Sequence, residues 1–137
     1  GIGEEKTKID RFIKDNSLEQ NIILLGYQNN VFKFLKNCKA FILSSLWEDP
    51  GFVLIEAMMS DCLVLSSNCP NGPKEIIERK NGILFQSNSE TDFIHKYNHL
   101  INLSDNEKKQ LRINAKKKIK NYSIFHHYQQ LQKLLIN

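Results

Sequence analysis

Short apolar runs alternate along the chain with stretches in which apolar residues recur every three or four positions. The runs predict buried strands at 21–25, 40–43, 63–65 and 82–85. The periodic stretches predict helices at 4–18, 30–38, 52–60 and 73–77, and helical structure from residue 93 onward. Strands that alternate with helices and are apolar on both faces indicate an α/β fold, in which helices cover both faces of a parallel sheet.

A sheet of this kind has a preferred place for a ligand. In open parallel sheets, ligands bind at the carboxyl ends of the strands, next to the N-termini of helices. We therefore expect the binding residues in the loops that follow Leu25, Leu43 and Leu65.

The composition is that of one globular domain. The chain has 137 residues, of which 41% are apolar and 25% are charged, so intrinsic disorder and collagen-like structure are excluded. The apolar runs are too short to span a membrane, and the first residues are too polar for a signal peptide. The chain starts at Gly1-x-Gly3, a turn that should follow a strand, so a fragment of a longer protein is expected.

The basic charge is concentrated in one segment. The formal net charge is +4, but seven of the nineteen basic residues lie between 108 and 120, which leaves twelve basic against fifteen acidic residues elsewhere. We expect this segment to be a solvated helix face, with peripheral contact to an anionic membrane as the alternative. The chain lacks a broad basic face with aromatic or Gly-rich readers, so nucleic acid is not an expected partner.

Cysteine and histidine residues give no sign of a disulfide framework or a metal site. Cys38, Cys62 and Cys69 are odd in number and lack Cys-x2-Cys spacing, so reduced thiols are expected. His95 and His99 are four apart on an expected helix, but outside a metal-binding motif, and a solvated helix face is their expected setting.

Two carboxylates flank a glycine in the loop after the second expected strand. Glu48 and Glu56 stand on either side of Gly51, which permits close approach of the backbone to a ligand. The N–H groups of residues 52–54, at the start of the next helix, would form an anion site. A carboxylate can accept two hydrogen bonds from a sugar diol, so one Glu could hold a ribose and the other a hexose, with phosphate between them. The alternative is structural: a solvated loop acid and a helix acid favoured by the dipole.

This segment and four others resemble one enzyme family. Glu48-x7-Glu56 lies within Leu46-Trp47-Glu48-Asp49-Pro50-Gly51-Phe52 and Leu54-Ile55-Glu56-Ala57-Met58. The other segments are Gly1-x-Gly3, Leu25-Gly26-Tyr27-x-x-Asn30, the loop 66–77 (Ser-Ser-Asn-Cys-Pro-Asn-Gly-Pro-Lys-Glu-Ile-Ile) and Asn81-Gly82-Ile83-Leu84-Phe85. Together they resemble the family 4 retaining glycosyltransferases of the GT-B fold, among the glycosyl transferases group 1, over the chain up to about Leu103.

The resemblance implies a role for each part of the chain. Residues 1–137 would form the Rossmann-like C-terminal domain that binds the donor, and 123–137 would be a closing helix that returns toward an N-terminal acceptor domain. Glu56 would bind the ribose hydroxyls of a nucleotide-diphosphate sugar, and Glu48, as the catalytic residue, would contact the transferred sugar. The donor would further contact the amides of Gly51, Phe52, Val53 and Leu54, and its base would lie by Gly26, Tyr27 and Gln28.

The implied reaction is sugar transfer with retention of configuration. A hexosyltransferase would move a sugar from a nucleotide-sugar donor, expected to be a UDP-sugar, to a glycan or lipid-linked acceptor. The implied setting is the biosynthesis of surface polysaccharide, such as lipopolysaccharide, in the cytoplasm at the inner face of the membrane. An Arg and a Lys of the family, upstream of Gly1, would stabilise the departing diphosphate, so no metal or other cofactor is expected. The chain alone, without these residues and the acceptor domain, is expected to be inactive.

Three other functions stay open at this point. The intact Glu48-x7-Glu56 pattern disfavours a sugar-nucleotide epimerase of GT-B architecture. A nicotinamide-dinucleotide domain is disfavoured because Gly1-x-Gly3-x-x-Lys6 lacks the third Gly. A non-catalytic nucleotide-binding module differs from a transferase only in the activity of the whole protein.

Four positions depart from the family pattern. Asp61 and Leu63 stand where the family usually has Gly and Pro, Asn68 replaces an Asp, and Asn71 replaces a Gly. Asp tolerates the left-handed backbone conformation better than most residues, so the preceding helix can still end at Asp61. The departures therefore concern the fit of the loops rather than the fold.

Overall fold

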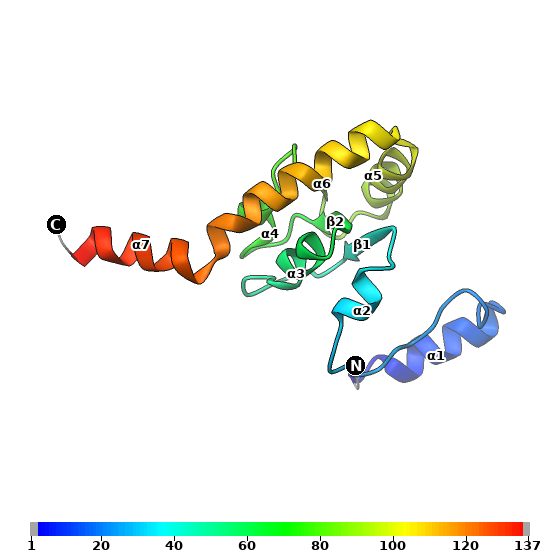
Figure 1. Cartoon of the computed structure of the whole chain (residues 1–137). Coiled ribbons are helices and arrows are strands. Elements are labelled where there is room, and N and C mark those ends of the chain that lie inside the picture. Colours follow the sequence, from blue (N-terminus) through cyan, green and yellow to red (C-terminus); the bar gives the residue numbers. More distant parts are fainter. Residues whose placement is uncertain (1–2, 136–137) are drawn as a thin grey trace. The chain divides into compact units, whose positions relative to one another are not determined.

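The computed structural model describes residues 3–135, and the chain divides after Val31 into two compact units. The first unit contains helix α1 (Lys6–Asp15), which confirms the helix predicted at 4–18 (Figure 1). Ile13 is the buried residue of this helix. Gly1 of the Gly1-x-Gly3 turn lies outside the described residues.

The strand predicted at 21–25 is wrong. Residues 22–28 have no regular secondary structure, and the side chain of Ile23 is 75% exposed. The apolar run has the pattern of a buried strand, but a strand forms only where its N–H and C=O groups pair with a neighbour. Among its described residues the first unit contains no strand that could provide this pairing.

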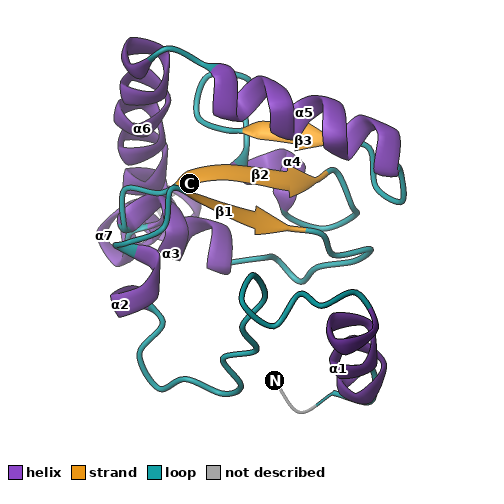
Figure 2. Cartoon of the chain, turned by 90° about the vertical axis from the view of Figure 1, so that its right-hand side faces the viewer, coloured by secondary structure: helices purple, strands orange, loops and turns teal. Residues whose placement is uncertain are grey.

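The second unit is an α/β fold built on three strands. In chain order its elements are α2 (Phe32–Leu35), β1 (Ala40–Leu43), α3 (Val53–Met59), β2 (Leu63–Ser67), α4 (Pro73–Ile76), β3 (Ile83–Phe85), α5 (Glu90–Asn102), α6 (Asp105–Ile119), the 3₁₀ turn η1 (Lys120–Tyr122) and α7 (Ile124–Leu135). The strands are parallel in the order β1-β2-β3, with Ala40 opposite Leu63 and Leu65 opposite Ile83 (Figure 2). These elements confirm the α/β class, the three other predicted strands and the expected helix at 123–137, of which residues 136–137 are not described.

Each face of the sheet has its own hydrophobic core. Side chains alternate along a strand, so Val64 lies on one face while Leu63 and Leu65 lie on the other. Val64 packs with residues of α3 and with Ala115 of α6, and Leu65 packs with Leu100 of α5. The prediction that helices cover both faces is therefore confirmed, and this packing fixes the strands that carry the site loops.

Helix α3 ends at a residue in the left-handed conformation. Asp61, directly after the C-cap residue Ser60, has a φ of 66°, which confirms that Asp serves here in place of Gly. Two cations of α6 contact this residue: Arg112 donates from Nε to the Asp61 carbonyl at 2.9 Å, and Lys116 pairs with the Asp61 carboxylate at 2.6 Å. The basic segment is thus more than a solvated face, because it also anchors α6 to the end of α3.

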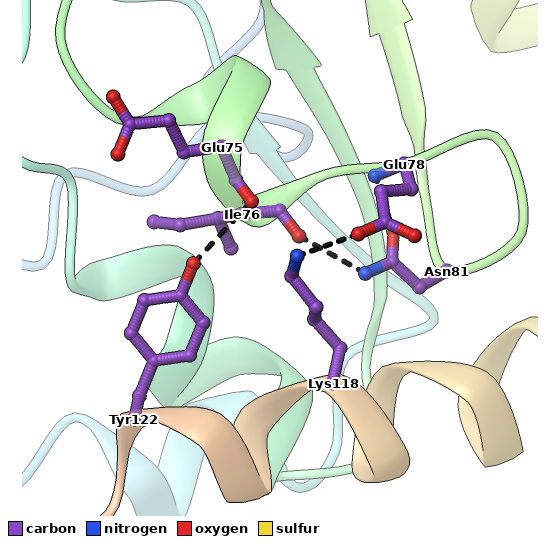
Figure 3. Close-up of polar contacts among 6 residues, drawn as sticks. All are labelled: Glu75, Ile76, Glu78, Asn81, Lys118 and Tyr122. Atoms are coloured by element: carbon purple, nitrogen blue, oxygen red, sulfur yellow. Dashed lines mark hydrogen bonds and ion pairs between the residues drawn. The ribbon is translucent and has the colours of Figure 1, made fainter. Parts of the chain in front are cut away.

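The loop between α4 and β3 is held by a buried asparagine. Asn81 is 4% exposed, and its Oδ1 accepts from the Glu78 N–H at 2.7 Å while its Nδ2 donates to the Ile76 carbonyl at 3.0 Å. Lys118 of α6 reaches the Glu78 carboxylate at 2.5 Å (Figure 3). Because the Asn81 side chain satisfies one buried and one partly buried backbone group, it fixes the course of the loop.

Replacing Asn81 with Ala is expected to lower the free energy of unfolding by about 1–3 kcal/mol, because the buried Ile76 carbonyl and the partly buried Glu78 N–H lose their partner. Urea denaturation followed by circular dichroism measures this difference. Asn98→Ala, at an exposed position on α5, is the control and should stay within about 0.5 kcal/mol of the unaltered chain. Equal losses in the two variants would show that the Asn81 side chain does not hold the loop.

The three cysteines are free, as expected from their number and spacing. Cys62 and Cys69 are buried, and the Cys62 thiol donates to the Leu35 carbonyl at 2.7 Å. Burial raises the pKa of Cys62, so the thiol stays protonated near neutral pH. None of the helices within residues 3–135 combines the length and the apolar character that crossing a bilayer requires.

Candidate active site

Two loops meet at the carboxyl ends of β1 and β2. The hydroxyl of Ser67, the last residue of β2, donates to the carbonyl of Ser45 in the loop after β1, at 2.6 Å. Further along the same loop, the N–H of Glu48 donates to the carbonyl of Pro70 at 3.4 Å. The loop after β1 is therefore held in place by the loop after β2, at the edge where the fold class places a ligand.

The two loops also pack closely at Gly72. Its φ is +115°, and a Cβ at this position would lie 1.8 Å from the carbonyl oxygen of Pro50. The preceding residue, Asn71, has a φ of 60°, a conformation that Asn tolerates where the family commonly has Gly. The departure at Asn71 is thus accommodated, and the loop still packs directly against the Pro50-Gly51 peptide.

Glu48 is held at the inner side of its own loop. The side chain is half-buried, and its Oε1 accepts from the Ser45 hydroxyl at 2.5 Å. Gly51 has a φ of +77°, and a Cβ there would stand 3.5 Å from Glu48 Oε2. The carboxylate therefore lies beside the Gly51 backbone, with its second oxygen available to a ligand.

The start of α3 provides fewer backbone donors than the sequence predicts. Leu54 was expected to offer a free amide, but its N–H donates to the Gly51 carbonyl at 3.0 Å, and its side chain is fully buried in the core. Among the described residues, the N–H groups of Phe52 and Val53 have no hydrogen-bond acceptor. The expected anion site is thus reduced to two amides, because the third closes the first turn of the helix.

Glu56 faces an open cavity of about 630 Å³ between α3 and the η1–α7 segment. The Glu56 side chain is half-buried, and within the described chain its carboxylate has no hydrogen-bond donor. The cavity is also lined by polar residues from the other side, including Asn121, Ser123, His126 and Gln130. Glu48 does not line this cavity. Glu48 lies in the loop before α3 and Glu56 lies within α3, so the two carboxylates are close in the sequence but do not share one pocket.

The polar residues of the η1–α7 segment were missed by sequence reasoning. Ser123 accepts from the N–H of His126 at 3.2 Å and so caps α7, and Gln130 Nε2 lies 3.4 Å from His126 Nε2. They carry no motif and lie more than sixty positions after Glu56. The only signal was an N-cap serine at the start of an amphipathic helix, which marks a boundary rather than a site.

The residues expected to lie by the base belong to the first unit. Gly26 has a φ of +65°, Tyr27 is 82% exposed, and Gln28 Nε2 donates to the Leu25 carbonyl at 2.6 Å. Within that unit, Gly26 lines a cavity of about 420 Å³. The role of these residues at a nucleotide base stays a prediction.

The chain is similar to known glycosyltransferases in sequence and in structure. It is 36% identical over 103 residues (74% of this chain, 21% of that protein) to the poly(ribitol-phosphate) alpha-N-acetylglucosaminyltransferase of Staphylococcus aureus. It is 31% identical over 91 residues (66% of this chain, 25% of that protein) to the N-acetylgalactosamine-N,N'-diacetylbacillosaminyl-diphospho-undecaprenol 4-alpha-N-acetylgalactosaminyltransferase of Campylobacter jejuni. A crystal structure of a S. aureus TarM mutant in complex with Fondaparinux, alpha-GlcNAc-glycerol and UDP matches with a TM-score of 0.83 and 30% identity, over 96% of this chain and 27% of that one.

The chain spans about a fifth of the length of the curated relatives that it matches first. The family described as glycosyl transferases group 1 matches residues 1–118, which include both site loops and helix α3. The chain belongs to the glycosyl transferases group 1 family.

Proposed function

We propose that this chain is the donor-binding, C-terminal domain of a two-domain GT-B glycosyltransferase that uses a UDP-sugar. The observation that carries the proposal is the loop after β1: its Glu48 and Pro50 contact the loop after β2, and Glu56 follows one turn into α3. The complex of the TarM mutant with UDP supports the choice of nucleotide.

Glu56 is the proposed ligand of the ribose. A ribose offers two adjacent hydroxyls, and one carboxylate can accept a hydrogen bond from each. The Glu56 carboxylate is half-buried, has no donor within the described residues and faces a cavity of about 630 Å³. A partly desolvated acceptor without a protein donor gains most from a hydroxyl ligand, because such charge-assisted bonds are stronger than neutral ones.

Glu48 and the start of α3 are the proposed contacts of the sugar and the diphosphate. The amides of Phe52 and Val53 can donate to phosphate oxygens, and Glu48 is held by Ser45 beside Gly51. In the reaction the bond between the anomeric carbon and the diphosphate oxygen breaks, the acceptor hydroxyl oxygen bonds to the same face of that carbon, and the hydroxyl proton leaves with the nucleoside diphosphate. Positive groups lower the barrier by stabilising the departing diphosphate, so we propose transfer without a metal, with the needed cations supplied by an Arg and a Lys upstream of Gly1.

The acceptor is proposed to be a surface glycan or a lipid-linked sugar. The printed names of the two relatives describe transfer to poly(ribitol-phosphate) and to a sugar on diphospho-undecaprenol. The acceptor would lie in the N-terminal domain, toward which α7 would return. A cytoplasmic location and peripheral contact with the inner face of the membrane stay predictions of the resemblance.

Replacing Glu56 with Ala is expected to weaken UDP binding by about 1–3 kcal/mol, the cost of losing a charge-assisted hydrogen bond. Isothermal titration calorimetry of UDP into the chain measures the difference. Glu90→Ala is the matched control, because Glu90 is also an acid in the first turn of a helix, α5, but is exposed and lies outside the site. If the Glu56 variant bound UDP as tightly as the Glu90 variant, Glu56 would have no place in the nucleotide site.

A further inference from the structure

A second polar cavity lies at the end of the sheet opposite the candidate active site. It has a volume of about 530 Å³ and is lined by the α4–β3 loop, the start of β3 and α5. Gly82 and Ile83 lie at the amino-terminal end of β3, whereas the site loops follow the carboxyl-terminal ends of β1 and β2. Because the strands are parallel, the loops after β1 and β2 lie at one end of the sheet and the loop before β3 lies at the opposite end (Figure 2).

Cationic side chains gather in this cavity without partners. Arg79 from the loop and Lys96 from α5 both line it, together with His99 one turn further along α5. Lys80 lines an adjoining cavity of about 280 Å³ that shares Arg79 and His99 with the first. Within residues 3–135, the side chains of Arg79 and Lys96 form neither an ion pair nor a hydrogen bond.

The acidic groups near the cavity are already engaged. Glu78 is paired with Lys118, which holds the pKa of the Glu78 carboxyl below its usual value (Figure 3). Glu107 accepts from the N–H and the hydroxyl of Ser104 at 2.8 and 2.6 Å, and these hydrogen bonds likewise lower its pKa. Neither carboxylate neutralises Arg79 or Lys96, so the cavity keeps an excess of positive charge.

The loop that presents Arg79 is held on both sides. Asn81 ties the loop to the Glu78 N–H and the Ile76 carbonyl, and Asn114 of α6 donates to the Lys80 carbonyl at 2.8 Å. At Gly82 a Cβ would lie 2.6 Å from Val64 Cγ2, so the backbone is packed directly against β2. The cation is thus presented by a fixed backbone, which lowers the entropy lost when a ligand binds.

We propose that this cavity binds a phosphate ester through Arg79 and Lys96. A phosphate monoester carries close to two negative charges at neutral pH, and the planar guanidinium of Arg matches two phosphate oxygens at once. The volume exceeds that of a phosphate alone, and Ile77, Ile83 and Leu84 provide apolar wall for the attached group. The phosphate can come from a soluble ester or from a lipid headgroup, which share this chemistry.

The test is a titration of the isotope-labelled chain with glycerol 3-phosphate, followed by the amide NMR shifts of Arg79, Gly82 and Lys96. These shifts should saturate, and saturating UDP should leave them unchanged, because the candidate nucleotide site lies at the other edge. The double variant R79A/K96A should bind on the order of tenfold more weakly or worse. The matched control K109A/K117A removes the same charge from exposed positions of α6 and should bind like the unaltered chain.

The source of the phosphate is tested with vesicles of phosphatidylglycerol, with phosphatidylcholine vesicles as the neutral reference. Sedimentation with phosphatidylglycerol that R79A/K96A abolishes and K109A/K117A keeps assigns the cavity to a lipid headgroup. Saturable glycerol 3-phosphate binding without such sedimentation assigns it to a soluble ester. The proposal is overturned by equal affinities of the two double variants, by displacement of glycerol 3-phosphate with UDP, or by the absence of saturable shifts. Circular dichroism of both variants, whose altered side chains are exposed or half-buried, establishes that they are folded.

Discussion

Replacing Glu48 with Gln in the two-domain enzyme is expected to lower kcat by about 10²–10³-fold, the usual loss when one electrostatic contact to a transition state is removed. Positive charge develops at the anomeric carbon as the diphosphate departs, and a carboxylate beside that carbon stabilises it. Gln keeps the size of the side chain and can still accept from Ser45, so the loop should keep its conformation. The Kd for UDP should be nearly unchanged, because Glu48 is proposed to contact the sugar rather than the nucleotide.

Asp49→Asn is the matched control for this experiment. Asp49 is the next residue of the same loop and is exposed. Its replacement by Asn removes the same charge from a side chain that has no proposed contact with the donor. Steady-state kinetics at saturating donor, together with UDP titration, separates turnover from binding. A Glu48 variant that lost UDP binding but kept turnover at saturating donor would contradict the assignment.

Replacing Gly72 with Ala is expected to lower the free energy of unfolding by about 3 kcal/mol or more, because backbone strain and a steric clash act together. The φ of +115° disfavours any side chain, and the new Cβ would lie 1.8 Å from the Pro50 carbonyl oxygen. Relief of the clash requires the two site loops to separate, so the hydrogen bond from the Glu48 N–H to the Pro70 carbonyl should loosen as well. Urea denaturation measures the loss of stability.

Comparing Gly51→Ala with Gly72→Ala separates the cost of the left-handed backbone conformation from the cost of the steric clash. Gly51 has a φ of +77°, but its nearest neighbour would stand 3.5 Å from the new Cβ, which is ordinary contact. Its expected cost is therefore only the left-handed conformation, about 1–2 kcal/mol. If Gly51→Ala were as damaging as Gly72→Ala, close packing between the two loops would not be what stabilises this edge of the sheet.

The sheet and its helices could be predicted from the sequence because the pattern is local. Val64 and Leu65 are both apolar and lie on opposite faces of the same strand. They pack against different helices, Val64 against α3 and α6 and Leu65 against α5. The end of α3 at Asp61 was also predictable, because only the intrinsic tolerance of Asp for a positive φ was needed.

The failures concern interactions that a local pattern does not contain. The run that includes Ile23 has a strand's composition, but pairing depends on a neighbouring strand, which the described part of the first unit lacks. The amide of Leu54 was expected to be free, but the turn at Gly51 supplies it with an acceptor. Ser123 and His126 reach the Glu56 cavity only through the packing of η1 and α7, which no spacing near Glu56 encodes.

The central claim is that the loop after β1 and the start of α3 bind the donor nucleotide. The most direct measurement is a titration of the isotope-labelled chain with UDP, followed by amide NMR shifts, because this method detects weak binding and locates it. The expected result is saturable shifts at Gly51, Phe52 and Val53, and a UDP concentration at half-saturation that is roughly fivefold higher or more when Glu56 is replaced by Ala. Saturable UDP binding with shifts confined to residues outside 48–56, or no saturable binding at all, would contradict the account.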